Sequence, residues 1–166
     1  QSRILVSYTP GNEIIPKKER RETMPVRTAT AVWQGAVPGG TGQMDVGSKA
    51  FSVPFSFGTR FGNDPGTNPE ELIGAAHAGC FSMALAFALT QAGHTPERIQ
   101  TTAQVQIDQV EGGFRITRIA LETEGKVPGI DEATFQRFAE QAKNGCPVSQ
   151  ALRGVSEVTL NARLGN

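Results

Sequence analysis

The chain has 166 residues, and its 16 basic and 16 acidic side chains give a formal net charge of zero at pH 7. This balance gives no electrostatic reason to expect a nucleic acid or an anionic membrane as a partner, so it favours a small-molecule substrate. The length suits one domain with a sizeable core, and two cysteines are too few for a disulfide scaffold.

The first 23 residues differ in character from the rest. They contain two prolines, end in a cluster of acidic and basic side chains, and precede the first methionine, Met24. We interpret residues 1–23 as an N-terminal extension, either vector-derived or upstream coding sequence, and residues 24–166 as a single domain. No basic start followed by an apolar stretch and a small-residue cleavage site is visible, so we expect cytoplasmic residence.

Strands and a long helix are predicted next. Residues 26–33 alternate in polarity and predict a strand, residues 38–42 mark a turn, and a second strand is expected to run toward Phe55. A long helix then follows between Asn68 and Gly93.

The ends of this long helix carry clear signals. Asn68 suits the N-cap, Pro69 the first helical position and Gly93 the C-terminal stop, while Glu71 is placed to complete a capping box. Residues 72–96 contain no Asp, Glu, Lys or Arg. The length is compatible with a membrane span, but small and polar residues interrupt it, so we interpret it as a helix surrounded by protein.

The second half of the chain predicts two strands, two helices and a final strand. After the turn at Gly112–Gly113, the apolar positions change parity between Ile116 and Ile119, which predicts a bulge near Thr117. Asp131 is expected to cap a helix through Lys143. Its expected buried stripe comprises Ala133, Phe135, Phe138, Ala139 and Ala142.

A short helix over residues 148–152 and a last strand complete the expected order. Hairpins separated by helices indicate an α+β fold. A helix that is uncharged on every face needs cover on every face, and one small sheet covers only about half of it. A second protomer would supply the rest.

The two cysteines lie in contrasting settings. Cys80 is eleven residues after Pro69, about 16 Å into the long helix, so the helix dipole cannot stabilise its thiolate and a cation must come from elsewhere. Cys146 precedes Pro147 and occupies the N-cap position of the short helix, where the dipole lowers a thiol pKa. Local physics alone therefore favours Cys146 as the nucleophile.

Four segments carry a family resemblance. They are TRF at 59–61, TNPEELIGAAHAGCFSMAL at 67–85, VPGID at 127–131 and KNGCPVSQAL at 143–152. In order and spacing they resemble the OsmC branch of the OsmC/Ohr thiol peroxidases, from about Met24 to the C-terminus. The resemblance implies antiparallel sheets wrapped around long central helices in an intertwined homodimer.

The resemblance also implies a function and its residues. It implies a peroxidase that reduces organic hydroperoxides, and hydrogen peroxide less well, in stress defence without haem, flavin or metal. By position, Cys80 resembles the peroxidatic cysteine and Cys146 the resolving one, with Arg60 and Glu70 as the activating pair. The family suggests an external dithiol of lipoyl type as the reductant. Apolar neighbours of Cys80, such as Phe81, Met83 and Phe87, or Phe55, Phe57 and Phe61, are candidates to line the substrate pocket.

Other interpretations of these residues remain. One alternative is a zinc site built from Cys80, Cys146, His77 and His94. Their spacing matches no structural zinc pattern. His77 is otherwise a packed or hydrogen-bonded helix residue, and its alternative role is to adjust the thiol site. The alternative from another class of function is a non-catalytic stress or small-molecule-binding module with two inert buried cysteines.

Overall fold

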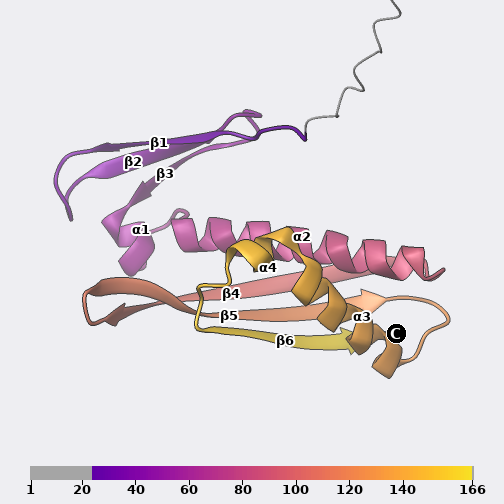
Figure 1. Cartoon of the computed structure of the whole chain (residues 1–166). Helices are drawn as coiled ribbons and strands as arrows, with labels where there is room; N and C mark the ends of the chain where they lie inside the picture. Colours follow the sequence, from indigo (N-terminus) through magenta and orange to yellow (C-terminus); the bar gives the residue numbers. More distant parts are fainter. Residues whose placement is uncertain (1–23, 166) are drawn as a thin grey trace, which may run out of the picture.

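The structure is a computed structural model that describes residues 24–165. Within that range the chain forms two three-stranded sheets and four helices (Figure 1). The expected N-terminal extension, residues 1–23, lies outside the described residues. The predicted α+β class is confirmed.

The first sheet is antiparallel and has the order β1-β2-β3. Its strands are β1 (Ala29–Gln34), β2 (Thr41–Val46) and β3 (Ser52–Ser56). The sequence predicted one strand where β2 and β3 lie, and this prediction was wrong. The chain reverses between Val46 and Ser52, where the Lys49 N–H donates to the Val46 carbonyl at 2.8 Å and Lys49 adopts a positive φ of 61°.

A short helix, α1 (Phe57–Phe61), follows β3 and was not predicted. The hydroxyl of Ser56 accepts from the Thr59 N–H at 3.2 Å, and the hydroxyl of Thr59 accepts from the Ser56 N–H at 3.0 Å. This reciprocal capping box stabilises a single turn that carries Arg60.

The long helix α2 (Pro69–Gln91) begins and ends as predicted. The Asn68 side chain accepts from the Glu71 N–H at 2.9 Å, whereas the Glu71 carboxylate accepts from the Thr67 hydroxyl, so only the Asn68 half of the expected capping box forms. At the other end, Gly93 has a φ of 84° and its N–H donates to the Thr90 carbonyl. The backbone N–H of His94 donates to the Leu89 carbonyl, which completes a Schellman motif.

The second sheet has the order β4-β5-β6 and is mixed. β4 (Arg98–Val110) pairs antiparallel with β5 (Gly113–Lys126), and β5 pairs parallel with β6 (Glu157–Leu164). The expectation of purely antiparallel sheets is therefore corrected: the helices between β5 and β6 return the chain to the same end of the sheet. Pairing passes from Gln106↔Arg118 to Ile107↔Ile116, which confirms the bulge at Thr117.

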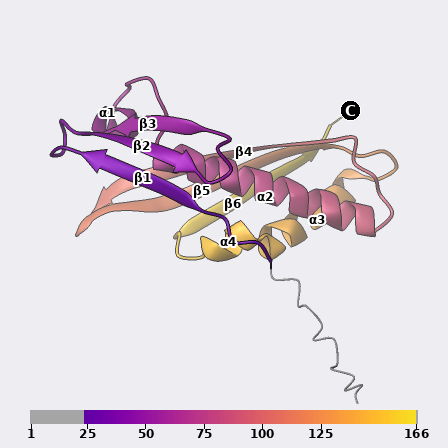
Figure 2. The same cartoon turned by 90° about the horizontal axis from the view of Figure 1, so that it is seen from above.

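Two helices connect β5 to β6. They are α3 (Glu132–Gly145) and α4 (Pro147–Ala151), and together with α2 they lie over one face of the second sheet (Figures 1 and 2). Asp131 caps α3 by accepting from the Thr134 N–H at 2.7 Å. Of the expected stripe, Phe135, Ala139 and Ala142 are buried and Phe138 is partly buried. Ala133, in the first turn of α3, is exposed, so its place in the stripe is corrected.

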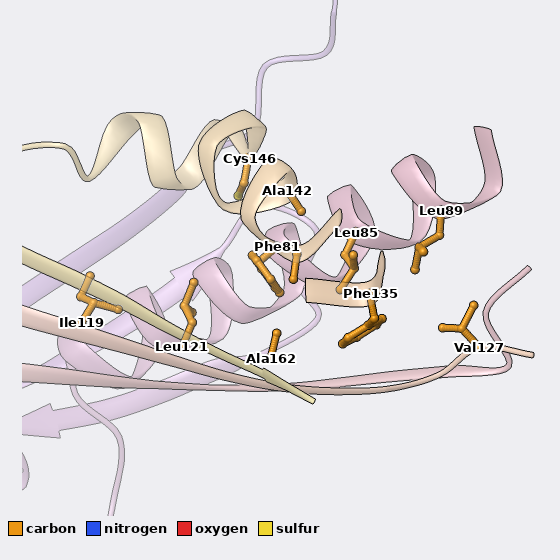
Figure 3. Packing of buried hydrophobic residues seen from close by; sticks show 11 residues of the cluster. Phe81, Leu85, Leu89, Ile119, Leu121, Val127, Phe135, Ala142, Cys146 and Ala162 are labelled. Carbon is orange, nitrogen blue, oxygen red and sulfur yellow. The ribbon is translucent and has the colours of Figure 1, made fainter. Parts of the chain in front are cut away.

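The core lies between these helices and the second sheet (Figure 3). α2 contributes one buried stripe, and it approaches β4 closely at Gly74, where a Cβ would lie 3.2 Å from the Ala103 carbonyl oxygen. The buried residues of the stripe are Glu70, Gly74, His77, Phe81, Leu85 and Leu89.

The opposite face of α2 is apolar and uncovered. Met83 is 75% exposed and Phe87 is 67% exposed. Within residues 24–165, α2 is the one helix long and apolar enough to cross a membrane, a test that core helices of soluble proteins also pass. Its stripe against the sheet identifies it as a core helix whose second face lacks cover in a single chain.

Candidate active site

The two cysteines lie in contact. Cys80 is in the middle of α2, and Cys146 is at the junction where α3 ends and α4 begins, with its backbone N–H donating to the Ala142 carbonyl at 2.8 Å. The two sulfur atoms are 2.9 Å apart, and both thiols are free. Figure 3 shows the Cys146 side chain on the core side of the junction. Packing of α2 against α3 and α4 thus closes a separation of 66 residues.

Their surroundings move the two thiol pKa values in opposite directions. Burial raises the pKa of Cys80, and the hydrogen bond to Cys146 raises it further, while the Val148 N–H opposes both. Burial also raises the pKa of Cys146, but hydrogen bonds from Cys80, Ser149 and Val148 outweigh burial and lower it. Either sulfur can carry the shared proton; since the backbone N–H groups of α4 favour a thiolate at Cys146, Cys80 is the donor.

Among residues 24–165, no cation contributes to the Cys80 pKa. A thiolate at Cys80 therefore lacks the positive neighbour that nucleophilic thiols normally require. The depth of Cys80 in the helix also places it beyond the reach of the α2 dipole, as the sequence indicated. In the isolated chain, Cys146 is the more acidic thiol.

A second polar pair lies where α1 approaches the start of α2. Arg60 Nη2 donates to Glu70 Oε1 at 2.7 Å, and Arg60 Nε lies 3.2 Å from both carboxylate oxygens. Glu70 is only 6% exposed, whereas the guanidinium also lies over the Phe61 ring at 5.1 Å. The Asn68 amide donates to the Thr59 carbonyl at 3.0 Å and fastens α1 to α2. A forked bond of this kind fixes the plane of the guanidinium.

The structure brings together each pair but separates the pairs from one another. Glu70 and Cys80 are ten residues apart on a continuous helix, which is about 15 Å along its axis. A cavity of about 220 Å³ beside Arg60 and Glu70 is lined by residues of α2 and β4, not by a cysteine. Within one chain, the thiol pair and the Arg60–Glu70 pair are therefore separate.

A third contact joins the same helices as the thiols do. His77 is fully buried on α2, and its Nε2 lies 2.8 Å from Ser149 Oγ on α4. Sequence reasoning named His77 but missed Ser149. The sequence did contain a signal for Ser149. It is the third residue of the helix that Cys146 caps, and residues at this position lie close to the N-cap side chain.

The residues considered for zinc do not converge. His77 is bonded to Ser149, and His94 lies edge-on to Phe138 at a ring distance of 6.1 Å. Within residues 24–165, no group of three or more His, Cys, Asp or Glu side chains is arranged to hold a metal ion.

The expected apolar lining is divided between core and surface. Phe81 is fully buried in the core and is not free to line a pocket. Phe57 and Phe61 are partly exposed, with their rings 4.9 Å apart, and Phe61 also lies 4.7 Å from the ring of Phe114. This aromatic group lies beside Arg60 rather than beside Cys80.

Comparison with known proteins identifies the family. A family model described as OsmC-like protein matches residues 62–161. A protein named peroxiredoxin OsmC, from Escherichia coli (strain K12), is 52% identical over 135 residues, which are 81% of this chain and 93% of that protein. The chain belongs to the OsmC-like protein family.

Other members of this family are also similar. An organic hydroperoxide resistance protein from Xanthomonas axonopodis pv. citri is 38% identical over 110 residues, covering 66% of this chain and 74% of its own length. The crystal structure of an organic hydroperoxide resistance protein from Elizabethkingia anophelis has a TM-score of 0.72 at 28% identity, covering 87% of this chain and 99% of that chain. The resemblance inferred from the sequence is confirmed.

Proposed function

We propose that this OsmC-like protein is a thiol-dependent peroxidase that reduces organic hydroperoxides through Cys80 and Cys146. The observation that carries the proposal is the 2.9 Å contact between two free sulfur atoms on different helices. The names of relatives from Escherichia coli and Xanthomonas, a peroxiredoxin and an organic hydroperoxide resistance protein, support the same reaction.

The reaction consumes two thiols for each peroxide. The Cys80 thiolate attacks one peroxide oxygen, the O–O bond breaks, and the departing alkoxide takes a proton to become an alcohol. Cys146 then attacks the sulfur of the sulfenic acid, the S–O bond breaks, and hydroxide leaves as water after taking the proton that Cys146 gave up. The two electrons come from the sulfur atoms, so no haem, flavin or metal is needed.

Cys80 is activated by Arg60 and Glu70 of a second protomer. Burial raises the Cys80 pKa, so a cation is needed for a thiolate at neutral pH. Arg60 is held in a fixed plane by Glu70, and a forked guanidinium can face a thiolate and a peroxide oxygen together. Because these groups lie far from Cys80 along α2, a homodimer that pairs the uncovered faces of two α2 helices would bring them together.

An external dithiol completes the cycle. The disulfide must be reduced by thiol–disulfide exchange, and a reducing compartment such as the cytoplasm suits a bond that is broken at each turnover. The family resemblance favours a lipoyl-type dithiol. Turnover of one organic hydroperoxide with dihydrolipoamide, thioredoxin and glutathione systems in parallel tests this choice.

Two serine variants test the roles of the cysteines. We expect Cys80→Ser to abolish hydroperoxide consumption, while Cys146→Ser permits one rapid oxidation and then stalls at sulfenic or sulfinic acid, because the resolving thiol is missing. Mass spectrometry after one equivalent of hydroperoxide reads out each product. The reverse pattern would make Cys146 the nucleophile, and slow reaction of both thiols would favour a non-catalytic binding module.

A further inference from the structure

Two hydrogen bonds connect α2 to the start of α4 at matched positions. His77 and Cys80 are three residues apart on α2, and Cys146 and Ser149 are three residues apart across the start of α4. Cys80 contacts Cys146 at 2.9 Å, and His77 Nε2 contacts Ser149 Oγ at 2.8 Å. The thiol pair and the His77–Ser149 pair therefore form two adjacent connections between the same helices.

The surroundings of His77 assign its proton. The imidazole is fully buried, and burial lowers its pKa, so the ring is neutral and carries one N–H. Among residues 24–165, Nδ1 has no hydrogen-bond partner. A buried N–H without an acceptor is rare and costly, so the proton belongs on Nε2, which does have a partner. Nε2–H therefore donates to Ser149 Oγ.

This direction determines what the Ser149 hydroxyl can do. Its oxygen accepts from His77, so its own proton is free to point at another acceptor. Cys146 is the acceptor in reach, since it lies one helical turn before Ser149 at the start of α4 and the Ser149 side chain lowers the Cys146 pKa. The hydrogen bonds thus run in one direction, from imidazole to hydroxyl to sulfur.

We propose that His77 is a positioning residue, which by donating to Ser149 Oγ holds the Ser149 hydroxyl as a donor to the Cys146 thiolate. This inference rests on the proposed function, in which Cys146 resolves the sulfenic acid of Cys80. In that step the thiolate forms the S–S bond while the S–O bond breaks. His77 and Ser149 keep their own protons throughout, so their effect is to raise the fraction of Cys146 that is ready to attack.

The first test measures the Cys146 thiol without any peroxide. In a Cys80→Ser background Cys146 is the remaining thiol, and the ultraviolet absorbance of its thiolate is titrated against pH. We expect Ser149→Ala and His77→Leu each to shift the titration to higher pH. His77→Gln should restore most of the wild-type value, because its amide N–H can occupy the place of the Nε2–H.

A double variant separates positioning from packing. If His77 acts through Ser149, then His77→Leu should have no further effect on the Cys146 titration once Ser149 is alanine. An unchanged titration in His77→Leu, or a His77 effect that persists without the Ser149 hydroxyl, would overturn the proposal. The His77→Gln and Ser149→Ala variants, which remove little volume, keep the test decisive should His77→Leu not fold.

The second test follows the reaction in the chain with both cysteines. After one equivalent of tert-butyl hydroperoxide, we expect His77→Leu to form the Cys80 sulfenic acid at the wild-type rate but to form the disulfide about tenfold more slowly at neutral pH, as loss of a hydrogen bond to a charged sulfur implies. An equal slowing of both steps would contradict the proposal. A shifted Cys146 titration in the Cys80→Ser background, together with no hydroperoxide consumption by the chain that has both cysteines, would support the hydrogen-bond assignment and refute the proposed function.

Discussion

At the scale of single residues, the two sulfurs in contact are not equivalent. Cys146 receives hydrogen bonds from Ser149 and Val148 that favour its thiolate, while Cys80 is raised in pKa by burial and by its bond to Cys146. A peroxidatic Cys80 therefore depends on a charge that residues 24–165 of its own chain do not place beside it. Arg60 is the cation that the family resemblance and its fixed bond to Glu70 favour.

Replacing Arg60 tests that dependence. Arg60→Lys keeps the charge but loses the planar fork, so oxidation of Cys80 should slow substantially while the fold persists. Arg60→Ala should leave Cys80 protonated at neutral pH, because its pKa is raised. A raised thiol pKa means that the thiolate grows with pH, so the Arg60→Ala rate should rise about tenfold per pH unit. Stopped-flow measurements across a range of pH give the rate of Cys80 oxidation in both variants. A fully active Arg60→Lys variant would show that Arg60 is not part of the site.

The site residues were named from sequence with unequal physical support. Cys146 was identifiable from the proline that follows it, and the depth of Cys80 in a long helix indicated that the helix dipole could not stabilise its thiolate. Arg60 and Glu70 had no local signal beyond the family resemblance, since an Arg that precedes a helix is usually solvated and the dipole alone favours a Glu in the first turn. Ser149 was missed because its contact with His77 depends on the packing of α4 against α2.

At the scale of elements, α2 was predicted well because its boundaries are set by local chemistry. Asn68 and Gly93 satisfy the backbone groups at the two ends, and such caps can be identified from sequence. The β2–β3 reversal depends instead on Lys49 adopting a positive φ, for which lysine gives no signal. The parallel pairing of β6 with β5 likewise depends on how α3 and α4 return the chain.

The C-terminal end of α2 allows a matched stability test. Gly93 has a φ of 84°, and the position that an alanine Cβ would occupy there is open, so Gly93→Ala adds backbone strain without a clash. We expect it to lower the free energy of unfolding by about 1–2 kcal/mol, measured by urea denaturation. Gly145→Ala is the control, because Gly145 also has open space around it but lacks a positive φ. If Gly93→Ala and Gly145→Ala changed the free energy of unfolding equally, the Schellman motif assigned at Gly93 would be contradicted.

At the scale of the whole molecule, the chain has the features of one half of an assembly. β1 is exposed along its full length, and the first sheet lies apart from the layer formed by α2 and the second sheet (Figure 1). The exposed Met83 and Phe87 lie on the uncovered face of α2. These surfaces favour a two-fold dimer in which the start of one α2 lies beside the middle of the other.

In such a dimer each active site combines residues of both protomers. Arg60 and Glu70 of one protomer would face Cys80 and Cys146 of its partner, giving two sites per dimer and no activity in a monomer. A Cys80→Ser protomer keeps its Arg60–Glu70 pair, and a Glu70→Ala protomer keeps both thiols. Their heterodimer would therefore contain one intact site and one site with both defects.

Subunit mixing tests this arrangement directly. Each homodimer should be severely impaired, but mixing the Cys80→Ser and Glu70→Ala proteins should recover about a quarter of wild-type activity, because random exchange makes half of the dimers mixed and each has one intact site. Two different affinity tags allow the heterodimer to be purified and its exchange verified. If all four side chains acted within one chain, the Cys80→Ser protomer would lack a nucleophile and its partner would lack Glu70, so the verified heterodimer would recover nothing.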